Sequence, residues 1–311
     1  MGVRGPSRGS LAYWHRSRSK RMVPRVRSWN FAVKGLSGFA GYKVGMTHVV
    51  MVDDSNSPTK GQEVIKSVTI MEVPPMFVYS IVAYAKTKVG LKCVAEATAA
   101  NAPKEFASVH TLAKNPKVTL KHLQEMSGKL SEIRVIAFTQ PRKTALKNSS
   151  DIVEIAIGGN ASEALEFAGA HLGKEVSAKD VFQEGEVIDT IAVTTGKGWQ
   201  GVVKRYGVAL NPHKATAHRR RGGSIGPERQ AKVMYTIPRA GQMGFHRRTD
   251  RNKRIVKIYD ETKPFPHYGI PKSSCLMIEG SIPGPAKRVI RLRKTLFDVR
   301  VKKPELKALT A

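Results

Sequence analysis

Excess positive charge is confined to three stretches of this 311-residue chain, and this segregation constrains the fold more than any other sequence feature. Residues 1–36 hold nine Lys and Arg and no acid, residues 191–254 hold fifteen against two, and residues 255–311 hold twelve against five. The intervening residues 37–190 hold seventeen of each sign. The pattern predicts a neutral folded body that carries a basic arm, a basic internal excursion and a basic tail.

The overall composition excludes several classes of protein. A formal net charge of +29 indicates a polyanionic partner. A hydrophobic content of 41% is enough to build a core, so the chain is not one disordered basic tail. Two cysteines cannot form a disulfide framework or a cysteine-based zinc site. We find no apolar run long enough to span a bilayer and no secretory signal, so we expect neither a membrane protein nor a secreted one.

The neutral body has the pattern of short antiparallel strands interrupted by helices. Runs rich in β-branched residues are separated by turn signals such as Pro74 and Pro75. Residues 102–130 and 161–173 have helical spacing instead, with Gly173 as a stop signal. The expected strands are Thr47–Val52, Ser67–Val73, Val78–Ala85, Leu91–Ala97, Glu186–Thr195, Arg254–Asp260, Ser273–Gly280 and Arg288–Arg293. This order predicts a mainly β fold, in which a β-barrel is interrupted by an α/β insertion.

The basic excursion, residues 204–254, has a composition that cannot fold alone. It holds fourteen Lys and Arg, many glycines and few large aliphatic residues, so self-repulsion would leave it disordered without a partner. Arginine grips phosphates bidentately and stacks on bases, and glycine lets the backbone approach closely. A flexible finger entering folded RNA explains this mixture better than a reader of duplex DNA, which uses a rigid helix or ribbon. The alternative is a basic surface that is merely solvated and has no specific partner. This alternative could explain a single basic cluster, but it explains three separate acid-poor stretches poorly.

Gly196–Gly201 (GKGWQG) matches the G-x-G-x-x-G pattern of dinucleotide-binding proteins and follows an expected strand. We reject that function because the residues from Val202 onward are not expected to open a helix. A ribose-binding acid is also missing near the expected offset of about 20 residues. We interpret the motif as a strand-to-loop junction where glycine permits close approach and Lys197 and Trp199 face the partner.

The sequence contains no pattern typical of catalysis or metal binding. Its nine histidines include no H-x-x-x-H or H-E-x-x-H spacing. The excursion holds only two acids, Glu228 and Asp250, which is too few to orient a general base or build a two-metal nuclease. We therefore expect no enzyme activity, no metal, no cofactor and no small-molecule substrate.

Trp14 and Trp29 lie among arginines in the basic arm, and two roles are open for them. They could stack on nucleotides, or they could fasten the arm to the body. Cys93 and Cys275 lie in strand-like runs, and both are expected in the core.

Several segments, taken together and in order, resemble one known family. They are Phe39–Val50, Ile188–Gly207, Gly223–Pro227, Arg239–Ile255 and Phe265–Lys294. In these segments the chain resembles the universal ribosomal large-subunit protein three family, archaeal type. The resemblance extends over nearly the whole length of the chain. It implies a translation-factor-like six-stranded β-barrel with a long basic loop and N- and C-terminal extensions.

The resemblance also implies a function in translation. The protein would be a structural constituent of the large ribosomal subunit in the cytoplasm, would bind 23S-type large-subunit rRNA directly, and would support early subunit assembly. Its central loop would reach toward the peptidyl-transferase centre, and neighbouring large-subunit proteins would include protein fourteen. The alternative is a free RNA- or DNA-binding regulatory protein, which would hold its specificity on a stable helix or sheet rather than on loops.

These expectations divide the chain and select candidate residues. The domains would be a basic arm at 1–36, a barrel core at 37–101 and 176–203 with 255–295, an α/β subdomain at 102–175, a central loop at 204–254 and a tail at 296–311. The expected rRNA-binding residues are Arg16, Arg18, Arg21, Arg25, Lys43, Lys197, Trp199, Arg205, His218, Arg219, Arg220, Arg221, Arg229, Lys232, Arg239, His246, Arg247, Arg248, Lys253, Arg254, Lys287 and Arg288.

The expected loop tip, Gly226–Ala231, departs from the family pattern. Archaeal and eukaryotic relatives usually carry a tryptophan there, whereas this chain has Glu228 or its neighbour. A carboxylate cannot stack on a base as an indole does, and phosphate would repel it. Arg229 or Gln230 could supply the contact instead. His218 resembles a loop histidine that some eukaryotic members carry methylated, so its modification is a hypothesis.

Overall fold

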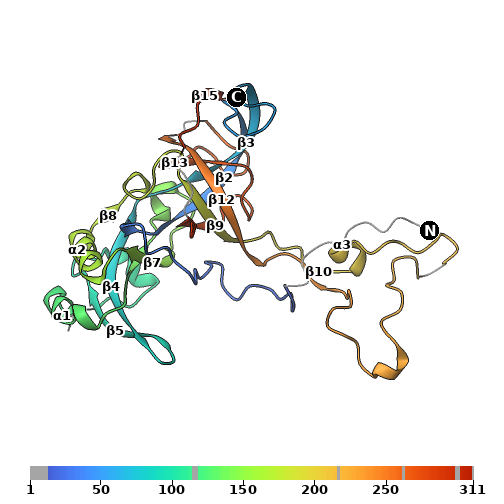
Figure 1. Cartoon of the computed structure of the whole chain (residues 1–311), viewed down its shortest axis with the longest axis horizontal. Coiled ribbons are helices and arrows are strands. Elements are labelled where there is room, and N and C mark those ends of the chain that lie inside the picture. Colours follow the sequence, from blue (N-terminus) through green and yellow to red (C-terminus); the bar gives the residue numbers. More distant parts are fainter. Residues whose placement is uncertain (1–12, 114–117, 216–217, 261–262, 298–301, 310–311) are drawn as a thin grey trace. The chain divides into compact units, whose positions relative to one another are not determined.

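The structure, a computed structural model, describes residues 13–113, 118–215, 218–260, 263–297 and 302–309. Its contacts divide the chain into two compact units (Figure 1). The two-sheet unit comprises Val23–Ala192 and Arg248–Ala311, and the arm–loop unit comprises Met1–Met22 and Val193–Arg247. Parts of the predicted arm, insertion, central loop and tail lie outside the described residues, at 1–12, 114–117, 216–217, 298–301 and 310–311.

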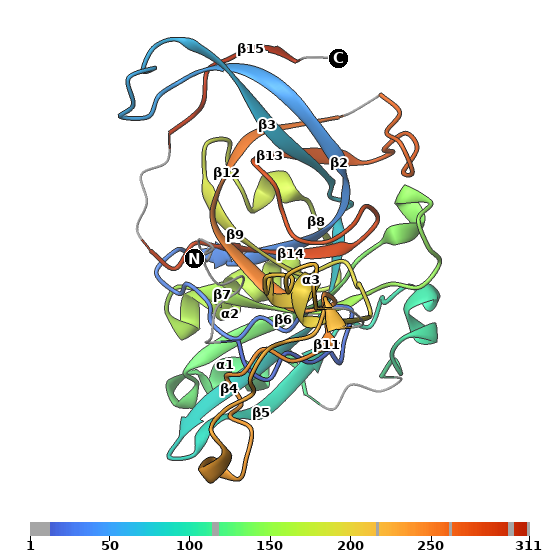
Figure 2. The same ribbon diagram turned by 90° about the vertical axis from the view of Figure 1, so that its right-hand side faces the viewer.

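Seven strands form the first sheet, and six of them close into a ring of pairings (Figure 2). Their order is β14-β9-β12-β13-β3-β2-β15, and an additional pairing joins β14 to β2, with Ile290 opposite Gly41. The seventh strand, β15, adds to the outside of this ring on β2. The strands are β2 (Gly38–Val52), β3 (Glu63–Glu72), β9 (Val187–Val193), β12 (Arg247–Asp260), β13 (Ser274–Glu279), β14 (Val289–Lys294) and β15 (Leu306–Leu309). The prediction of a mainly β fold is confirmed.

The second sheet has the order β1-β7-β6-β4-β5, with β8 paired to β4. Its strands are β1 (Gly35–Leu36), β4 (Met76–Thr87), β5 (Gly90–Thr98), β6 (Glu132–Phe138), β7 (Ile152–Gly158) and β8 (Glu175–Val176). The expected barrel segment 37–101 is therefore divided between two sheets, because β4 and β5 pair with the strands of the insertion. Pro74 and Pro75 end β3, since proline has no N–H to continue the ladder, and the chain leaves the first sheet there.

Helices occur where the sequence predicts them, although they are short. The longer one, α2 (Ala161–His171), buries Ala164, Leu165 and Ala168 and packs on the second sheet. Gly173 follows it in the left-handed conformation with φ +71°, as expected for a helix stop. The other elements of this kind are α1 (Leu120–Glu125) and the 3₁₀ turns η1 (Lys104–Ser108), η2 (Ser127–Lys129), η3 (Pro141–Thr144) and η4 (Ala178–Asp180).

One hydrophobic cluster joins the two sheets. It includes Phe39 and Leu276 from the first sheet and Ile81 from the second, all fully buried. Cys275 is also fully buried, so its predicted core position is confirmed. The same prediction for Cys93 is wrong, because residues 90–94 of β5 are all exposed, on both faces of the strand.

The arm–loop unit contains short elements: β10 (Trp199–Gln200), α3 (Val202–Tyr206), η6 (Glu228–Gln230) and β11 (Gly241–Gln242). Two expectations about this region are wrong. A helix does follow Gly201, although α3 is only five residues long and ends at the left-handed Gly207. The central loop also ends before residue 254, because β12 begins at Arg247 and pairs into the first sheet.

Candidate nucleic-acid interface

The base of the central loop is a hydrogen-bonded frame built by residues 194–200 and 241–246. Trp199 pairs with Gln242 where β10 meets β11. The Lys197 N–H donates to the Met243 carbonyl, and the Met243 N–H donates to the Gly198 carbonyl, both at 2.9 Å. The GKGWQG motif therefore forms a strand-to-loop junction, and it leaves the Trp199 side chain 76% exposed.

The described part of the arm packs on this frame through aromatic and cationic side chains. Trp14 stacks on Tyr206 of α3, with ring centroids 5.7 Å apart. The guanidinium groups of Arg16 and Arg205 lie 4.5 Å and 5.1 Å from the centre of the same Tyr206 ring. Arg205 also donates to the Gln242 carbonyl at 3.0 Å. Two of the expected rRNA-binding arginines thus hold the unit together by cation–π contacts and hydrogen bonds.

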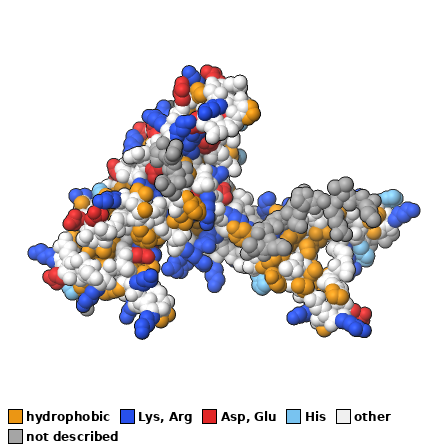
Figure 3. All heavy atoms as spheres, in the orientation of Figure 1, with side chains coloured by type: hydrophobic (Ala, Val, Ile, Leu, Met, Phe, Trp, Pro, Cys, Tyr) orange, Lys and Arg blue, Asp and Glu red, His pale blue; other side chains and the backbone are white. Residues whose placement is uncertain are grey.

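Most of the expected rRNA-binding residues are exposed to solvent. The loop cations from Arg219 to Arg239 form no ion pair with an acidic side chain among the described residues. On the face drawn in Figure 3, most acidic side chains lie on the two-sheet unit. The exposed candidates are Arg18, Arg21, Arg25, Lys197, Trp199, His218, Arg219, Arg220, Arg221, Arg229, Lys232, Arg239, Arg247 and Lys287.

The other candidates are half-buried, and at least two of them use their charge within the sheets. Arg254 pairs with Asp54 at 2.6 Å and with Glu279 at 3.0 Å. Burial acts to lower the pKa of Arg254, but these carboxylates raise it above its ordinary value. Burial lowers the pKa of Lys43, whose ammonium donates to backbone carbonyls. The half-buried candidates are Arg16, Lys43, Arg205, His246, Arg248, Lys253, Arg254 and Arg288.

The lower arm, residues 23–34, is fastened to the two-sheet unit by Trp29. This side chain is 7% exposed and belongs to the main core cluster. The guanidinium of Arg291 lies 5.5 Å from the centre of its ring. Of the two roles left open by the sequence, Trp29 has the fastening role.

Two arginines that the sequence analysis did not select hold the lower arm in place. Arg291 and Arg293 lie on β14 and are both buried. Arg291 donates to the Pro24 carbonyl at 3.4 Å, and Arg293 donates to the Ser28 carbonyl at 2.8 Å and to the Asp189 carboxylate. Their spacing of two within a strand places both on one face, and this signal could have identified them.

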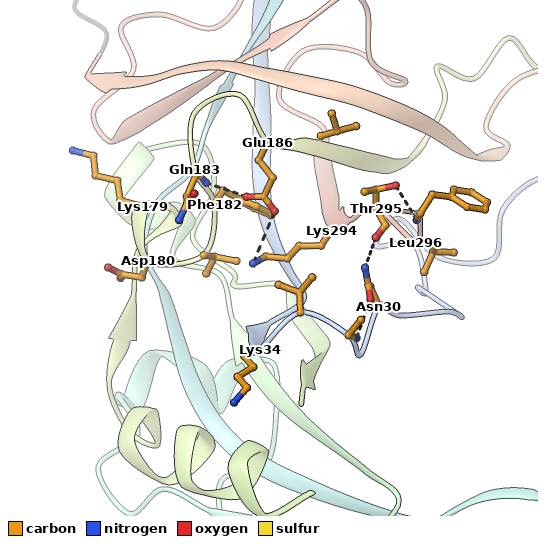
Figure 4. A pocket seen from close by; sticks show the side chains of 15 residues that line it. Asn30, Lys34, Lys179, Asp180, Phe182, Gln183, Glu186, Lys294, Thr295 and Leu296 are labelled. Atoms are coloured by element: carbon orange, nitrogen blue, oxygen red, sulfur yellow. Dashed lines mark hydrogen bonds and ion pairs between the residues drawn. The ribbon is translucent and has the colours of Figure 1, made fainter. Parts of the chain in front are cut away.

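A cavity of about 870 Å³ lies in the two-sheet unit between the lower arm and the residues that follow β14. Figure 4 shows Lys294 directed toward Glu186, with 3.9 Å between Nζ and Oε1. The Asn30 side chain donates to the Thr295 carbonyl at 2.6 Å. Burial raises the pKa of Glu186. Because the lining carries both signs of charge, this cavity does not select for a polyanion.

Among the residues that the structure describes, no group of three or more His, Cys, Asp or Glu side chains is placed to hold a metal ion. No described helix has both the length and the apolar character needed to cross a membrane. The groups that the arm–loop unit exposes for binding are mainly cationic side chains, aromatic rings and glycine backbone.

Comparison with known proteins agrees with this chemistry. Residues 2–308 match the family model described as Ribosomal protein L3. The chain is 46% identical over 306 residues to large ribosomal subunit protein uL3 of Methanopyrus kandleri. The aligned region covers 93% of this chain and 84% of that protein. It is 45% identical over 308 residues to large ribosomal subunit protein uL3 of Archaeoglobus fulgidus. That aligned region covers 95% of this chain and 93% of the Archaeoglobus protein. The chain therefore belongs to the ribosomal protein L3 family, a family of structural ribosomal proteins and not of enzymes.

Proposed function

We propose that this chain is a structural constituent of the large ribosomal subunit in the cytoplasm and that it binds large-subunit rRNA directly. The observation that carries the proposal is how the two units use their cations. In the two-sheet unit, Arg134, Lys147 and Arg254 pair with carboxylates, as do other lysines and arginines of that unit. The exposed Arg219–Arg221 and Arg229 have no such partner within the described part of the chain. Their charge is available for phosphate.

The irregular backbone of the arm–loop unit favours folded RNA over duplex DNA. A duplex groove is usually read by a regular helix or ribbon, and the longest helix among the described residues of this unit has five residues. Folded RNA presents irregular cavities and unstacked bases, which suit loops with exposed arginines and an exposed indole such as Trp199. This argument separates the ribosomal function from that of a free DNA-binding regulator.

The proposal includes finer points that rest on the family resemblance. The closed ring of six strands is a translation-factor-like β-barrel, and the chain is divided into domains as the resemblance implies, apart from the strands already reassigned. The central loop reaches toward the peptidyl-transferase centre with η6 at its tip, where Arg229 or Gln230 replaces the tryptophan of relatives. The protein supports early subunit assembly, with protein fourteen among its neighbours. Methylation of His218 stays a hypothesis, which the intact mass of a peptide containing it would test.

Sedimentation of tagged protein expressed in an archaeal host tests the ribosomal function. We expect the wild-type chain to cofractionate with large subunits and to leave them only at high salt. Replacing Arg219, Arg220 and Arg221 together with Ala should reduce incorporation. The matched control replaces Lys34, Arg142 and Lys143 with Ala, because these three exposed cations already pair with carboxylates. This control should incorporate like the wild type.

Two outcomes would contradict the proposal. Fractionation of the wild-type chain with the chromosome or with small soluble complexes would favour the regulatory alternative. Equal incorporation of the two triple variants would show that unpaired loop cations do not carry the binding.

A further inference from the structure

A second cavity, of about 480 Å³, lies entirely within the arm–loop unit. It is lined by arm residues 18–22 and by Gly196, Gly198, Gln242 and Phe245. Small-molecule sites have cavities of about 300–1,000 Å³, so the space is large enough for one nucleotide. The cavity therefore has the size of a binding site rather than of a packing defect.

Hydrogen bonds to backbone carbonyls hold the walls of this cavity in place. The Ser19 N–H donates to the Phe245 carbonyl at 2.8 Å, which ties the arm to the frame. The Phe245 N–H donates to the Thr195 carbonyl at 3.2 Å. The Gln242 side-chain amide donates to the Gly244 carbonyl at 3.0 Å. Because three separate segments are cross-linked, the cavity exists before any ligand enters it.

The lining of the cavity includes glycine backbone and an aromatic residue. Gly198 has φ +65°, which favours glycine, and no other group lies within 4 Å of the position a Cβ would take. At Gly196 a Cβ would meet the Phe245 side chain at 3.6 Å, which is ordinary contact. A flat ring could thus lie against Phe245 and the peptide groups of the two glycines.

The cavity is also lined by basic residues. Arg18, Lys20 and Arg21 are exposed and form no ion pair among the described residues, and no acidic side chain lines the cavity. The larger cavity of Figure 4 differs, because Asp180 and Glu186 line it together with lysines. A lining that combines glycine backbone, an aromatic residue and exposed cations is complementary to a nucleobase joined to phosphates.

We propose that this cavity binds one unstacked nucleotide of large-subunit rRNA. The base lies against Phe245 and the backbone of Gly196 and Gly198, and the flanking phosphates contact Arg18 and Arg21. This inference rests on the proposed function, because it takes rRNA as the ligand. It adds a shape-selective contact to the phosphate contacts of the central loop.

A substitution that fills the cavity without removing charge tests the inference. Gly196→Val places a side chain in the cavity at a position whose φ an L-residue tolerates. Its affinity for a large-subunit rRNA transcript should fall about 5- to 150-fold, the range expected when one stacked base is lost. The slope of binding against salt should not change, because no cation is removed. Gly128→Val is the control, since Gly128 lies in the two-sheet unit with open space around it.

The outcomes separate this inference from the proposed function. If the wild-type chain binds the transcript tightly and Gly196→Val binds equally well, the cavity is not a nucleotide site although the protein is an rRNA binder. If the wild-type chain does not bind, the proposed function itself fails. A thermal unfolding midpoint of Gly196→Val equal to that of the wild type shows that lost affinity is not lost folding.

Photo-crosslinking identifies the occupant directly. A benzophenone amino acid in place of Met22, which is 53% exposed at the cavity, should react in large subunits with a single nucleotide. That nucleotide should lie in a loop or bulge of the rRNA. Crosslinks to another protein, or crosslinks spread along an rRNA helix, would overturn the inference.

Discussion

The indole of Trp14 stacks on the ring of Tyr206, with centroids 5.7 Å apart and planes inclined by 27°. This contact joins the N-terminal arm to helix α3 within the arm–loop unit. Tyr206 is 9% exposed, so the pair forms a small core in a region that composition alone assigns to disorder. The arm–loop unit therefore has a structured base, whereas its tip around η6 has no buried side chain.

Replacing Trp14 with Ala should loosen this base without unfolding the two-sheet unit. An aromatic pair contributes about 0.5–1.5 kcal/mol beyond the area it buries. Amide hydrogen exchange of the free protein should become faster at residues 201–206 and 239–246. Trp199→Ala is the matched control, because that indole is 76% exposed. Strong protection across 218–236 in the free protein would contradict our expectation that the tip is ordered by RNA.

Replacing Ile191 with Ala should destabilise the two-sheet unit. Its side chain is 3% exposed in the main core cluster, and truncating a buried isoleucine costs about 2–5 kcal/mol. Ile65→Ala provides the same chemical change at a position that is 65% exposed. Urea unfolding followed by circular dichroism measures both. A loss of stability as large for Ile65→Ala as for Ile191→Ala would refute the assignment of the core.

Breaking the buried ion pair of Arg293 and Asp189 should destabilise the protein strongly. Both side chains are almost fully buried, at 4% and 1% exposed, so Arg293→Ala leaves an uncompensated carboxylate in the core. Such a loss costs about 3–5 kcal/mol. Lys34→Ala, which breaks an exposed pair with Glu163, should cost less than about 1 kcal/mol. Equal unfolding midpoints for the two variants would contradict this difference.

Removing Arg219, Arg220 and Arg221 together should change the salt dependence of rRNA binding more than it changes stability. Exposed substitutions usually alter stability by under about 0.5 kcal/mol each. Three lost phosphate contacts should reduce the log–log salt slope by about 2, at about 0.7 for each phosphate of a single strand. Arg134→Ala is the control, because Arg134 is paired with Glu132 and Glu154. It should lower stability and leave the slope unchanged.

Asp53 should make stability depend on pH in the acid range. Its carboxylate accepts hydrogen bonds from Thr59 at 2.6 Å, from the Ser57 hydroxyl at 2.7 Å and from the Ser55 N–H at 3.0 Å. These bonds hold the pKa of Asp53 well below its ordinary value of 3.8, and the bond from Thr59 has the largest effect. A depressed folded pKa gives stability that is present above 3.8 and lost as the pH falls through the folded value.

Asp53→Asn should therefore be less stable than the wild type at pH 7, and the difference should shrink as the pH is lowered below 4. Urea unfolding midpoints of both proteins across a pH series measure this difference. A difference that stays constant from pH 6 to pH 2 would refute the role of the ionised carboxylate.

The sequence by itself determined where most elements lie and where the charge is available. Alternating β-branched runs predict strands because side chains in a strand point to opposite faces. Helical spacing with Gly173 predicts α2 and its end. Segregated charge predicts the basic arm and loop, because composition is a local property that folding does not change.

Tertiary structure decided which strands pair and which charges are neutralised. Nothing local in β4 and β5 indicates that they join the second sheet, since partners are chosen by packing with strands far along the chain. Cys93 is exposed because both faces of β5 are open to solvent at residues 90–94, which its own sequence does not encode. Arg254 and Asp54 pair although they are 200 residues apart, and Arg293 reaches a buried carboxylate. A cation becomes structural or remains unpaired according to such distant partners, and only the folded chain brings them together.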